Sequence, residues 1–162
     1  MNYLNLDEKK VTRTVNELNR LLSNYHIYYQ NLRNAHWNIQ GHNFFDLHEK
    51  FEELYDDARL KIDEIAERVL TLRHIPLSRM SDYLSMGSIE ESEILQTDND
   101  MVDMILENHE IIIANMRDVI EAADESNDEG TIDMIGGFLE NLEKKSWMLD
   151  AWRSRKLEPV TA

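Results

Sequence analysis

The side chains best suited to chemistry are histidines and carboxylates in the first half of this sequence. His48 and Glu52 are four residues apart, and a helix places such a pair on one face. Asp63 and Glu67 repeat that spacing, and His36 precedes His48 by twelve residues. The chain contains no cysteine, so any metal must be held by imidazole and carboxylate groups. This ligand set suits iron or manganese.

Two long amphipathic segments must position these side chains. Apolar residues recur at three- and four-residue steps from about Glu8 to Asn38, and again after Asn43 to about Arg73. Gly41 separates the two segments, and Asn43 is the expected N-cap of the second helix. Because the connection is short, it should fold His36 back beside the start of the second helix.

The rest of the chain predicts a long connection and a second pair of helices. The periodic pattern lapses over residues 74–97, apart from a short helix expected around Met80–Ser85. Two further helices are expected, over about Asp98–Ala123 and about Thr131–Ser154. A long crossover lets the second and third helices run the same way, as ferritin-like bundles require. We therefore expect an all-α fold, a single ferritin-like domain over residues 1–162, with a short extra helix in the crossover between helices two and three.

The length of the second helix limits how the ligands can be used. Fifteen residues separate His48 from Asp63, which is about 22 Å along a helix axis, whereas zinc and similar metals bind their ligands at roughly 2 Å. If all five residues serve one site, Asp63 and Glu67 must come from a second copy of the chain. Two copies related by a two-fold axis would then hold two equivalent sites. Taken singly, each acidic pair is more often a solvated face, and a bundle without metal chemistry would leave the joint pattern a coincidence.

The residues from Ala35 to Arg68 resemble a known family. The string AHWNIQGHNFFDLHEKFEELYDDARLKIDEIAER is similar to the signature of the Dps (DNA-binding protein from starved cells) mini-ferritins. The resemblance lies in the His-Trp-Asn, Leu-His-Glu and Asp-x-x-x-Glu elements at their spacing, and it extends more loosely over nearly the whole chain, including Lys144–Leu149. It implies hollow shells of twelve subunits, with ferroxidase sites between subunits related by a two-fold axis.

Carried over by position, the resemblance implies that iron is bound by His36, His48 and Glu52 of one chain and by Asp63 and Glu67 of a second. The implied reaction is oxidation of Fe(II) by hydrogen peroxide, or more slowly by oxygen, with ferric mineral stored inside the shell. Such a protein protects against oxidative damage under stress. Glu52 departs from the Asp that is frequent in the family, and its longer side chain can bind through water or shift one metal position.

Larger ferritins offer a contrast, because each of their bundles carries an intrachain Glu-x-x-His pair. None of the six histidines here has Glu three residues before it. A site of that type is therefore not expected. Trp37, next to His36, can supply an electron to an oxidising intermediate, although packing at an interface is the more frequent role of such a residue. The remaining histidines, His26, His42, His74 and His109, are expected at surface or packing positions.

Other carboxylates can guide iron. An acidic stripe on the first half of the second helix consists of Glu49, Glu52, Glu53 and Asp56. Such a stripe is usually solvated, but in a shell it can line the cavity and nucleate mineral. Asp128 and Asp133 flank the start of the last helix, where the family's three-fold entrance pores carry acidic groups. Rings of carboxylates concentrate cations, which suits the uptake of Fe(II).

The formal net charge of −15 bears on possible partners. Acidity keeps a protein soluble and also attracts cations, and composition alone does not separate the two effects. A net negative charge repels DNA, because binding to DNA needs basic groups. The basic clusters near the two ends are short and consist of Lys9, Lys10, Arg13, Arg153, Arg155 and Lys156. We therefore expect weak or absent DNA binding, with a DNA-compacting shell protein of starved cells as the alternative function.

The N-terminal string MNYLNLDEKK lacks the apolar stretch of a signal peptide. No apolar run approaches the roughly 20 residues needed to span a bilayer. A cytoplasmic protein that does not contact membranes is expected.

Overall fold

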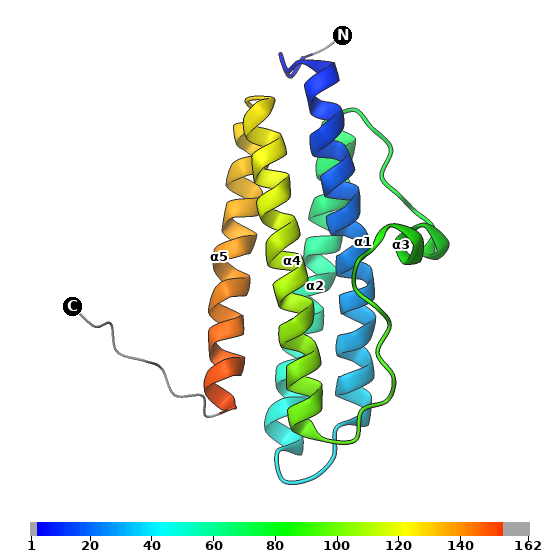
Figure 1. Ribbon diagram of the computed structural model, residues 1–162, viewed down its shortest axis with the longest axis vertical. Helices are drawn as coiled ribbons and strands as arrows, with labels where there is room; N and C mark the ends of the chain where they lie inside the picture. Colours follow the sequence, from blue (N-terminus) through cyan, green and yellow to red (C-terminus); the bar gives the residue numbers. More distant parts are fainter. Residues whose placement is uncertain (1–2, 154–162) are drawn as a thin grey trace, which may run out of the picture.

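The computed structural model describes residues 3–153, which contain five α-helices and no strand. The helices are α1 (Glu8–Asn38), α2 (Phe44–Thr71), α3 (Met80–Met86), α4 (Asp98–Glu125) and α5 (Glu129–Trp152). The four long helices lie side by side in a bundle, and α3 lies outside it against α1 (Figure 1). The predicted all-α bundle with a short helix in the crossover is confirmed. The predicted helix ends agree to within about two residues, apart from Ser154, which lies outside the described residues.

The core lies between the four long helices, because each presents an apolar stripe to the bundle axis. Leu18 of α1, Phe51 of α2, Ile112 of α4 and Ile135 of α5 are all completely buried. Each such side chain contributes roughly 1.5–3 kcal/mol relative to an exposed one. No helix among residues 3–153 is both long enough and apolar enough to cross a membrane.

The turn between α1 and α2 has the short, tight geometry that the sequence predicts. Gly41 has a φ of 96°, a left-handed conformation that costs glycine little. Asn43 precedes α2 as expected, but its side chain makes no capping hydrogen bond. Instead its amide donates to the Asp98 carboxylate at the start of α4, at 2.6 Å. The turn is thus tied to α4, and α2 starts directly beside the end of α1.

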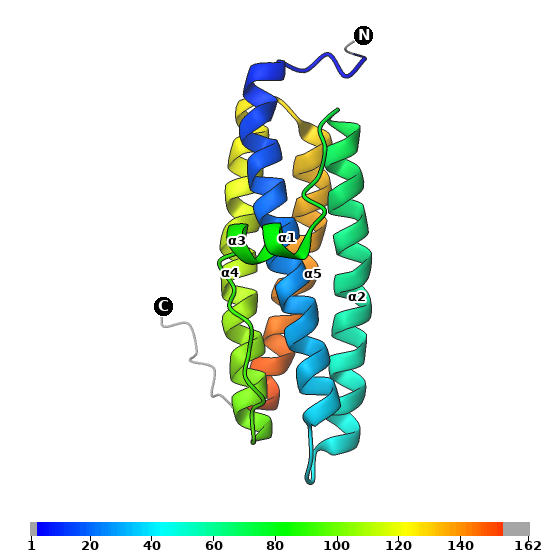
Figure 2. The same ribbon diagram turned by 90° about the vertical axis from the view of Figure 1, so that its right-hand side faces the viewer.

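The crossover carries the chain from one end of the bundle to the other, with α3 halfway (Figures 1 and 2). Two asparagines on the buried face of α1 hold the second half of the crossover in place. The Asn24 side-chain oxygen accepts from the backbone N–H groups of Ser88 and Ile89, at 2.7 and 3.2 Å, and the Asn31 oxygen accepts from Ser92 N–H at 2.9 Å. These bonds satisfy backbone donors that lie against the bundle, so the long connection has a defined path. As a result, α2 and α4 run in the same direction.

Candidate metal centre

The structure brings His36 and His48 together at the turn between α1 and α2. Their rings are stacked, with centroids 3.8 Å apart and planes inclined by 17°. His36 Nδ1 lies 2.7 Å from the carbonyl oxygen of His48, and His48 Nδ1 lies 2.9 Å from the carbonyl oxygen of His36. A carbonyl oxygen can only accept, so each Nδ1 carries a proton, and in the neutral ring the lone pair is then on Nε2. This is the tautomer that a metal-binding imidazole needs.

Aromatic side chains hold the two imidazoles in place. Tyr55 of α2 meets the His36 ring edge-on, with centroids 5.2 Å apart, and the Phe44 ring stacks on His48 at 4.8 Å. His36 is buried, whereas His48 is half-buried. Tyr55 and Phe44 are not among the site residues expected from the sequence. Their spacing of seven and four residues from His48 was the available signal, because residues at these intervals share one helix face.

Glu52 lies one helical turn beyond His48 and is exposed. Partial burial raises the pKa of the Tyr55 hydroxyl, and the nearby carboxylates of Glu52 and Asp56 raise it further. The Glu52 carboxylate is therefore close to the tyrosine that contacts His36. His36 and His48 thus form a pair near the start of α2, and Glu52 lies one helical turn further along α2, beside Tyr55.

Asp63 and Glu67 lie on the other half of α2 and are both exposed. Within residues 3–153, no three or more side chains of the His, Asp and Glu types are close enough together to hold one metal ion. α2 is a continuous helix between His48 and Asp63. One chain therefore presents the candidate ligands as two separate groups on α2, with His36 of α1 joined to the first.

Trp37 is 59% exposed. The Arg33 guanidinium lies over its ring at 4.8 Å from the centroid, and also over the Tyr29 ring at 5.1 Å. Trp37 follows the buried His36 on α1 but lies at the surface. A large exposed aromatic ring is the kind of side chain that protein interfaces bury.

The acidic stripe is exposed along its length. It consists of Glu49, Glu52, Glu53 and Asp56, and Lys50 pairs with Glu53 at 2.7 Å. Within residues 3–153, the other three carboxylates form no ion pair. The stripe is therefore a surface feature in the single chain.

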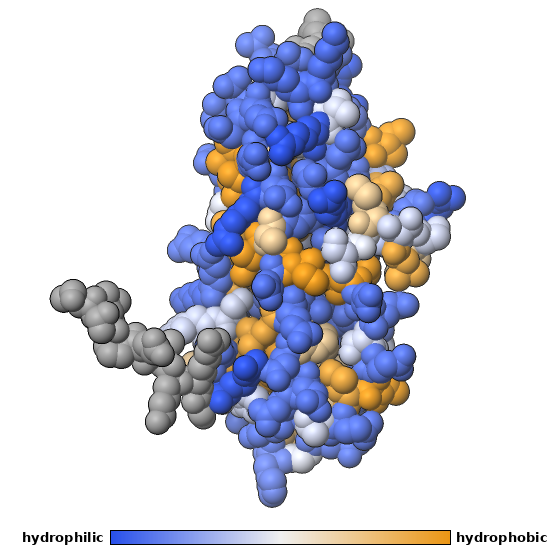
Figure 3. Space-filling view, viewed as in Figure 1, coloured by the Kyte–Doolittle hydropathy of each residue, from blue (hydrophilic) through white to orange (hydrophobic). Residues whose placement is uncertain are grey.

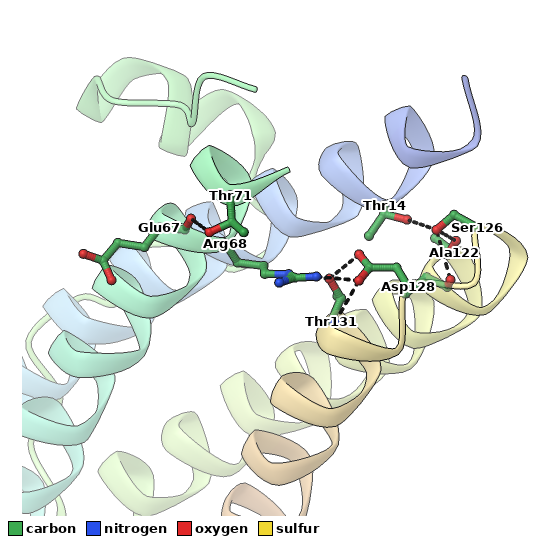
Figure 4. Close-up of polar contacts among 9 residues, drawn as sticks. Thr14, Glu67, Arg68, Thr71, Ala122, Ser126, Asp128 and Thr131 are labelled. Carbon is green, nitrogen blue, oxygen red and sulfur yellow. Dashed lines mark hydrogen bonds and ion pairs between the residues drawn. The ribbon is translucent and has the colours of Figure 1, made fainter. Parts of the chain in front are cut away.

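Asp128 differs from the expected pore-lining geometry. It is 2% exposed and is the N-cap of α5, where it accepts from the Thr131 backbone N–H at 3.1 Å and from the Thr131 hydroxyl at 2.5 Å. Arg68 of α2 pairs with it at 2.5 Å, as Figure 4 shows. Asp128 is thus a buried helix cap, because capping and the ion pair both draw its carboxylate inward. Asp133 is the exposed member of the predicted pair.

Two of the remaining histidines occupy packing positions, as expected. His109 is buried between Tyr28, whose hydroxyl lies 2.7 Å from Nε2, and Ser146, whose oxygen lies 2.8 Å from Nδ1. Burial, and to a smaller extent the charge of Lys145, lowers the pKa of His109 to about 3. The His26 ring stacks on Tyr83 of α3 at 3.9 Å. The centre of the bundle is therefore filled by apolar groups and neutral hydrogen bonds.

Comparisons with known proteins agree with this architecture. Residues 15–156 match the family model of the ferritin-like domain. The chain is 41% identical to the DNA protection during starvation protein of Porphyromonas gingivalis over 150 residues, which cover 93% of this chain and 94% of that one. It is 38% identical to DNA protection during starvation protein 2 of Bacillus anthracis over 140 residues, covering 86% and 96%.

A solved structure gives the same result at the level of the fold. The Dps protein of Vibrio cholerae, described as a member of a broad superfamily of ferritin-like diiron-carboxylate proteins, superimposes with a TM-score of 0.90. It is 41% identical and the match covers 94% of this chain and 96% of that one. With a family model that spans most of the chain and relatives that match it nearly end to end, this protein belongs to the Dps family of ferritin-like proteins.

Proposed function

We propose that this chain is a ferroxidase and iron-storage subunit that oxidises Fe(II), preferably with hydrogen peroxide, and stores the ferric product inside a shell. The observation that carries the proposal is the pair His36 and His48. The Nδ1–H of each histidine donates a hydrogen bond to the backbone carbonyl of the other, so both neutral rings can offer their Nε2 lone pairs to Fe(II). Imidazole and carboxylate donors bind iron well, and hard oxygen ligands favour the ferric state once the metal is oxidised.

We propose that the two groups of ligands meet between subunits. His36, His48 and Glu52 of one copy would face Asp63 and Glu67 of a second copy across a two-fold axis, which gives two equivalent sites per dimer. The separation of the two groups on α2 supports this arrangement, because a single chain keeps them apart. A closed homo-oligomer, a dodecamer by the family resemblance, would enclose the mineral.

The chemistry requires two electrons for each peroxide. Two Fe(II) ions and two protons reduce one hydrogen peroxide to two waters, and two Fe(III) ions result. Because both electrons are delivered together at a paired site, no hydroxyl radical is released. The role of this chain is to hold two Fe(II) ions close together, which converts a collision of separate reactants into a reaction within one site.

Further residues support uptake and storage in this proposal. Asp133, exposed in the second turn of α5, would attract Fe(II) at an entrance pore. Glu49, Glu53 and Asp56 would face the cavity and nucleate the mineral, and Trp37 would pack at the subunit interface or supply an electron to an oxidising intermediate.

Shells that mix two variants test the site between subunits. His48→Ala and Asp63→Ala each remove one ligand from every site of a uniform shell, so each should oxidise Fe(II) at least about tenfold more slowly. A dimer with one copy of each variant can assemble one intact site, and mixed shells should therefore regain activity. Stopped-flow measurement of Fe(II) oxidation under peroxide and under oxygen gives the rates and the preferred oxidant.

Shells of the double variant His48→Ala/Asp63→Ala provide the baseline for that experiment, because no dimer of them contains an intact site. Native mass measurement confirms that mixed and uniform shells have the same number of subunits. Mixed shells that remain at the baseline rate would exclude the arrangement between subunits.

A further inference from the structure

Arg68 connects the part of α2 that carries Glu67 to the start of α5. Its Nη2 donates to Asp128 Oδ1 at 2.5 Å, and its Nε donates to the Thr131 hydroxyl oxygen at 2.9 Å. Glu67 and Arg68 are consecutive, yet their side chains leave α2 in different directions. The guanidinium reaches across to α5 while the Glu67 carboxylate points away from it (Figure 4).

The acceptors of Arg68 are themselves held firmly. Asp128 accepts two hydrogen bonds from Thr131, and its backbone N–H donates to Ala123 at 2.9 Å. Ser126, two residues before Asp128, is buried and donates to the Ala123 carbonyl at 3.0 Å, and its hydroxyl oxygen lies 3.4 Å from that of Thr14 on α1. The turn between α4 and α5 is thus attached to α1 as well as to α5. Arg68 therefore binds to a fixed point of the bundle.

Gly130 makes room for this contact. A Cβ atom at Gly130 would lie 2.9 Å from Nη2 and 3.2 Å from Nη1 of Arg68, closer than side chains normally approach. At Gly136 and Gly137, in the same helix, an added Cβ would meet nothing within 4 Å. The absence of a side chain at Gly130 is thus matched to the guanidinium, and the other two glycines are suitable controls.

The seam between α2 and α5 depends on long side chains. Lys145 pairs with Asp57 at 2.8 Å, and Lys61 lies over the Phe138 ring at 4.3 Å. Arg68, which follows Glu67 in the sequence, makes a further contact of a long side chain between α2 and the start of α5. Rotation of α2 by about 20° would move a carboxylate at its surface by roughly 2 Å, since the helix with side chains is about 10–12 Å across. Such a movement equals a whole metal–oxygen bond length of roughly 2 Å.

We propose that Arg68 is a positioning residue for metal binding. It fixes the rotation of the last turns of α2 by attachment to the capped start of α5, and so it directs the Glu67 carboxylate. Metal affinity then depends on Asp128, Thr131 and Gly130, none of which touches the metal. The inference rests on the proposed function, because it takes Glu67 as a ligand.

A matched pair of glycine variants tests this role. Gly130→Ala displaces the guanidinium, whereas Gly136→Ala adds the same methyl group in open space. Cobalt(II) is the probe, because it binds sites of nitrogen and oxygen donors and its absorption reports their geometry. On assembled shells, Gly130→Ala should weaken cobalt(II) binding tenfold or more, the size of effect that partners of metal ligands commonly have. Gly136→Ala should bind as the wild type does.

A double-mutant cycle separates positioning from a general loss of stability. If Gly130→Ala acts by displacing Arg68, it should have no further effect on cobalt(II) affinity in an Arg68→Gln background. Independent, additive losses would overturn the proposal. If Gly130→Ala does not assemble, Thr131→Val removes the acceptor of Arg68 Nε together with the hydroxyl that donates to Asp128. A similar loss of cobalt(II) affinity is expected from it, and wild-type affinity in that variant would overturn the proposal.

Glu67→Gln in the same assay distinguishes the two proposals. Wild-type cobalt(II) affinity in Glu67→Gln would show that Glu67 is not a metal ligand, and this result would contradict the proposed ligand set. If Glu67→Gln weakens binding while Gly130→Ala and Thr131→Val form intact shells with wild-type affinity, the ligand set stands and the role of Arg68 is excluded.

Discussion

Histidines in this protein show how hydrogen-bond partners determine what an imidazole can do. His36 and His48 each donate from Nδ1 to a carbonyl, which leaves Nε2 to accept a proton or bind a metal. His109 uses both nitrogens inside the bundle. The Ser146 hydroxyl donates to the Leu142 carbonyl at 2.7 Å, so its oxygen accepts from Nδ1 of His109, and the Tyr28 hydroxyl donates to Nε2. His109 is thus a neutral structural group.

The buried state of His109 predicts acid sensitivity. The pKa of His109 is about 3 in the folded protein, against an ordinary value of 6.5 in the unfolded chain. On acidification, the unfolded chain therefore takes up a proton at a higher pH than the folded protein does. The buried neutral His109 therefore contributes fully to stability above pH 6.5, and this contribution is lost as the pH falls from 6.5 towards 3. Between pH 7.5 and 5.5 the loss is about 1 kcal/mol per subunit. Urea unfolding at both values, for wild type and His109→Gln, measures it; the variant should lose that part of the pH dependence. Equal pH dependence in both proteins would contradict this account.

At the scale of elements, two of the acidic residues near the start of α5 have different tasks. Asp128 caps the helix and is buried against Arg68, whereas Asp133 is exposed one turn later. Removal of either partner of a buried carboxylate–guanidinium pair destabilises the protein, since the other charge is left uncompensated. An exposed carboxylate adds mainly to the electric field outside the protein.

Separate substitutions at these two positions should therefore have different effects. Asp128→Asn keeps a capping side chain but loses the charge opposite Arg68, which should cost roughly 1–3 kcal/mol of stability. Asp133→Asn should leave thermal unfolding unchanged and slow the uptake of Fe(II) at low ionic strength, with a smaller difference in high salt because salt screens the field. Melting curves and iron-uptake rates at two salt concentrations measure both effects. A wild-type rate of Fe(II) uptake by Asp133→Asn at low ionic strength would show that Asp133 is a surface residue without a role in uptake.

At the scale of the whole molecule, charge governs the encounter with DNA. The chain has a formal net charge of −15, and the described basic residues near its ends are partly neutralised. Arg13 pairs with Glu125 and Glu121, and Arg153 pairs with Asp103. Arg155 and Lys156 lie outside the described residues. Non-specific DNA binding requires several cations that displace counterions from phosphates, and it weakens steeply with salt.

We accordingly expect no tight DNA binding by intact shells, although the relatives carry names that refer to DNA protection. A gel-shift assay with linear duplex at about 0.15 M salt and neutral pH tests this. A chelator excludes bridging by divalent metal, and an assay near the sequence pI of about 4.7 shows whether reduced repulsion permits weak association. Retarded DNA at sub-micromolar protein would show that the basic residues present a denser surface than their number suggests, and Arg155→Gln/Lys156→Gln would then be expected to abolish the shift.

Much of the architecture follows from local sequence pattern. Apolar periodicity predicts the four long helices within about two residues, because a helix repeats every 3.6 residues wherever it lies. The meeting of His36 and His48 was also predictable, since a short turn at Gly41 can only return the chain alongside itself. The separation of His48 from Asp63 follows from helix length alone. These features depend on residues close together in the sequence.

Other features were decided only by packing between distant segments. The burial of Asp128 depends on Arg68, 60 residues earlier, and nothing near Asp128 indicates that partner, although the cap formed with Thr131 follows a recognisable local pattern. The protonated nitrogen of each histidine depends on which carbonyl faces it across the turn. Such contacts arise when helices settle against one another at distances and rotations set by the whole core. Local pattern therefore determined the helices and the spacing of the candidate ligands, and tertiary packing decided which nitrogen and oxygen atoms are free of other contacts.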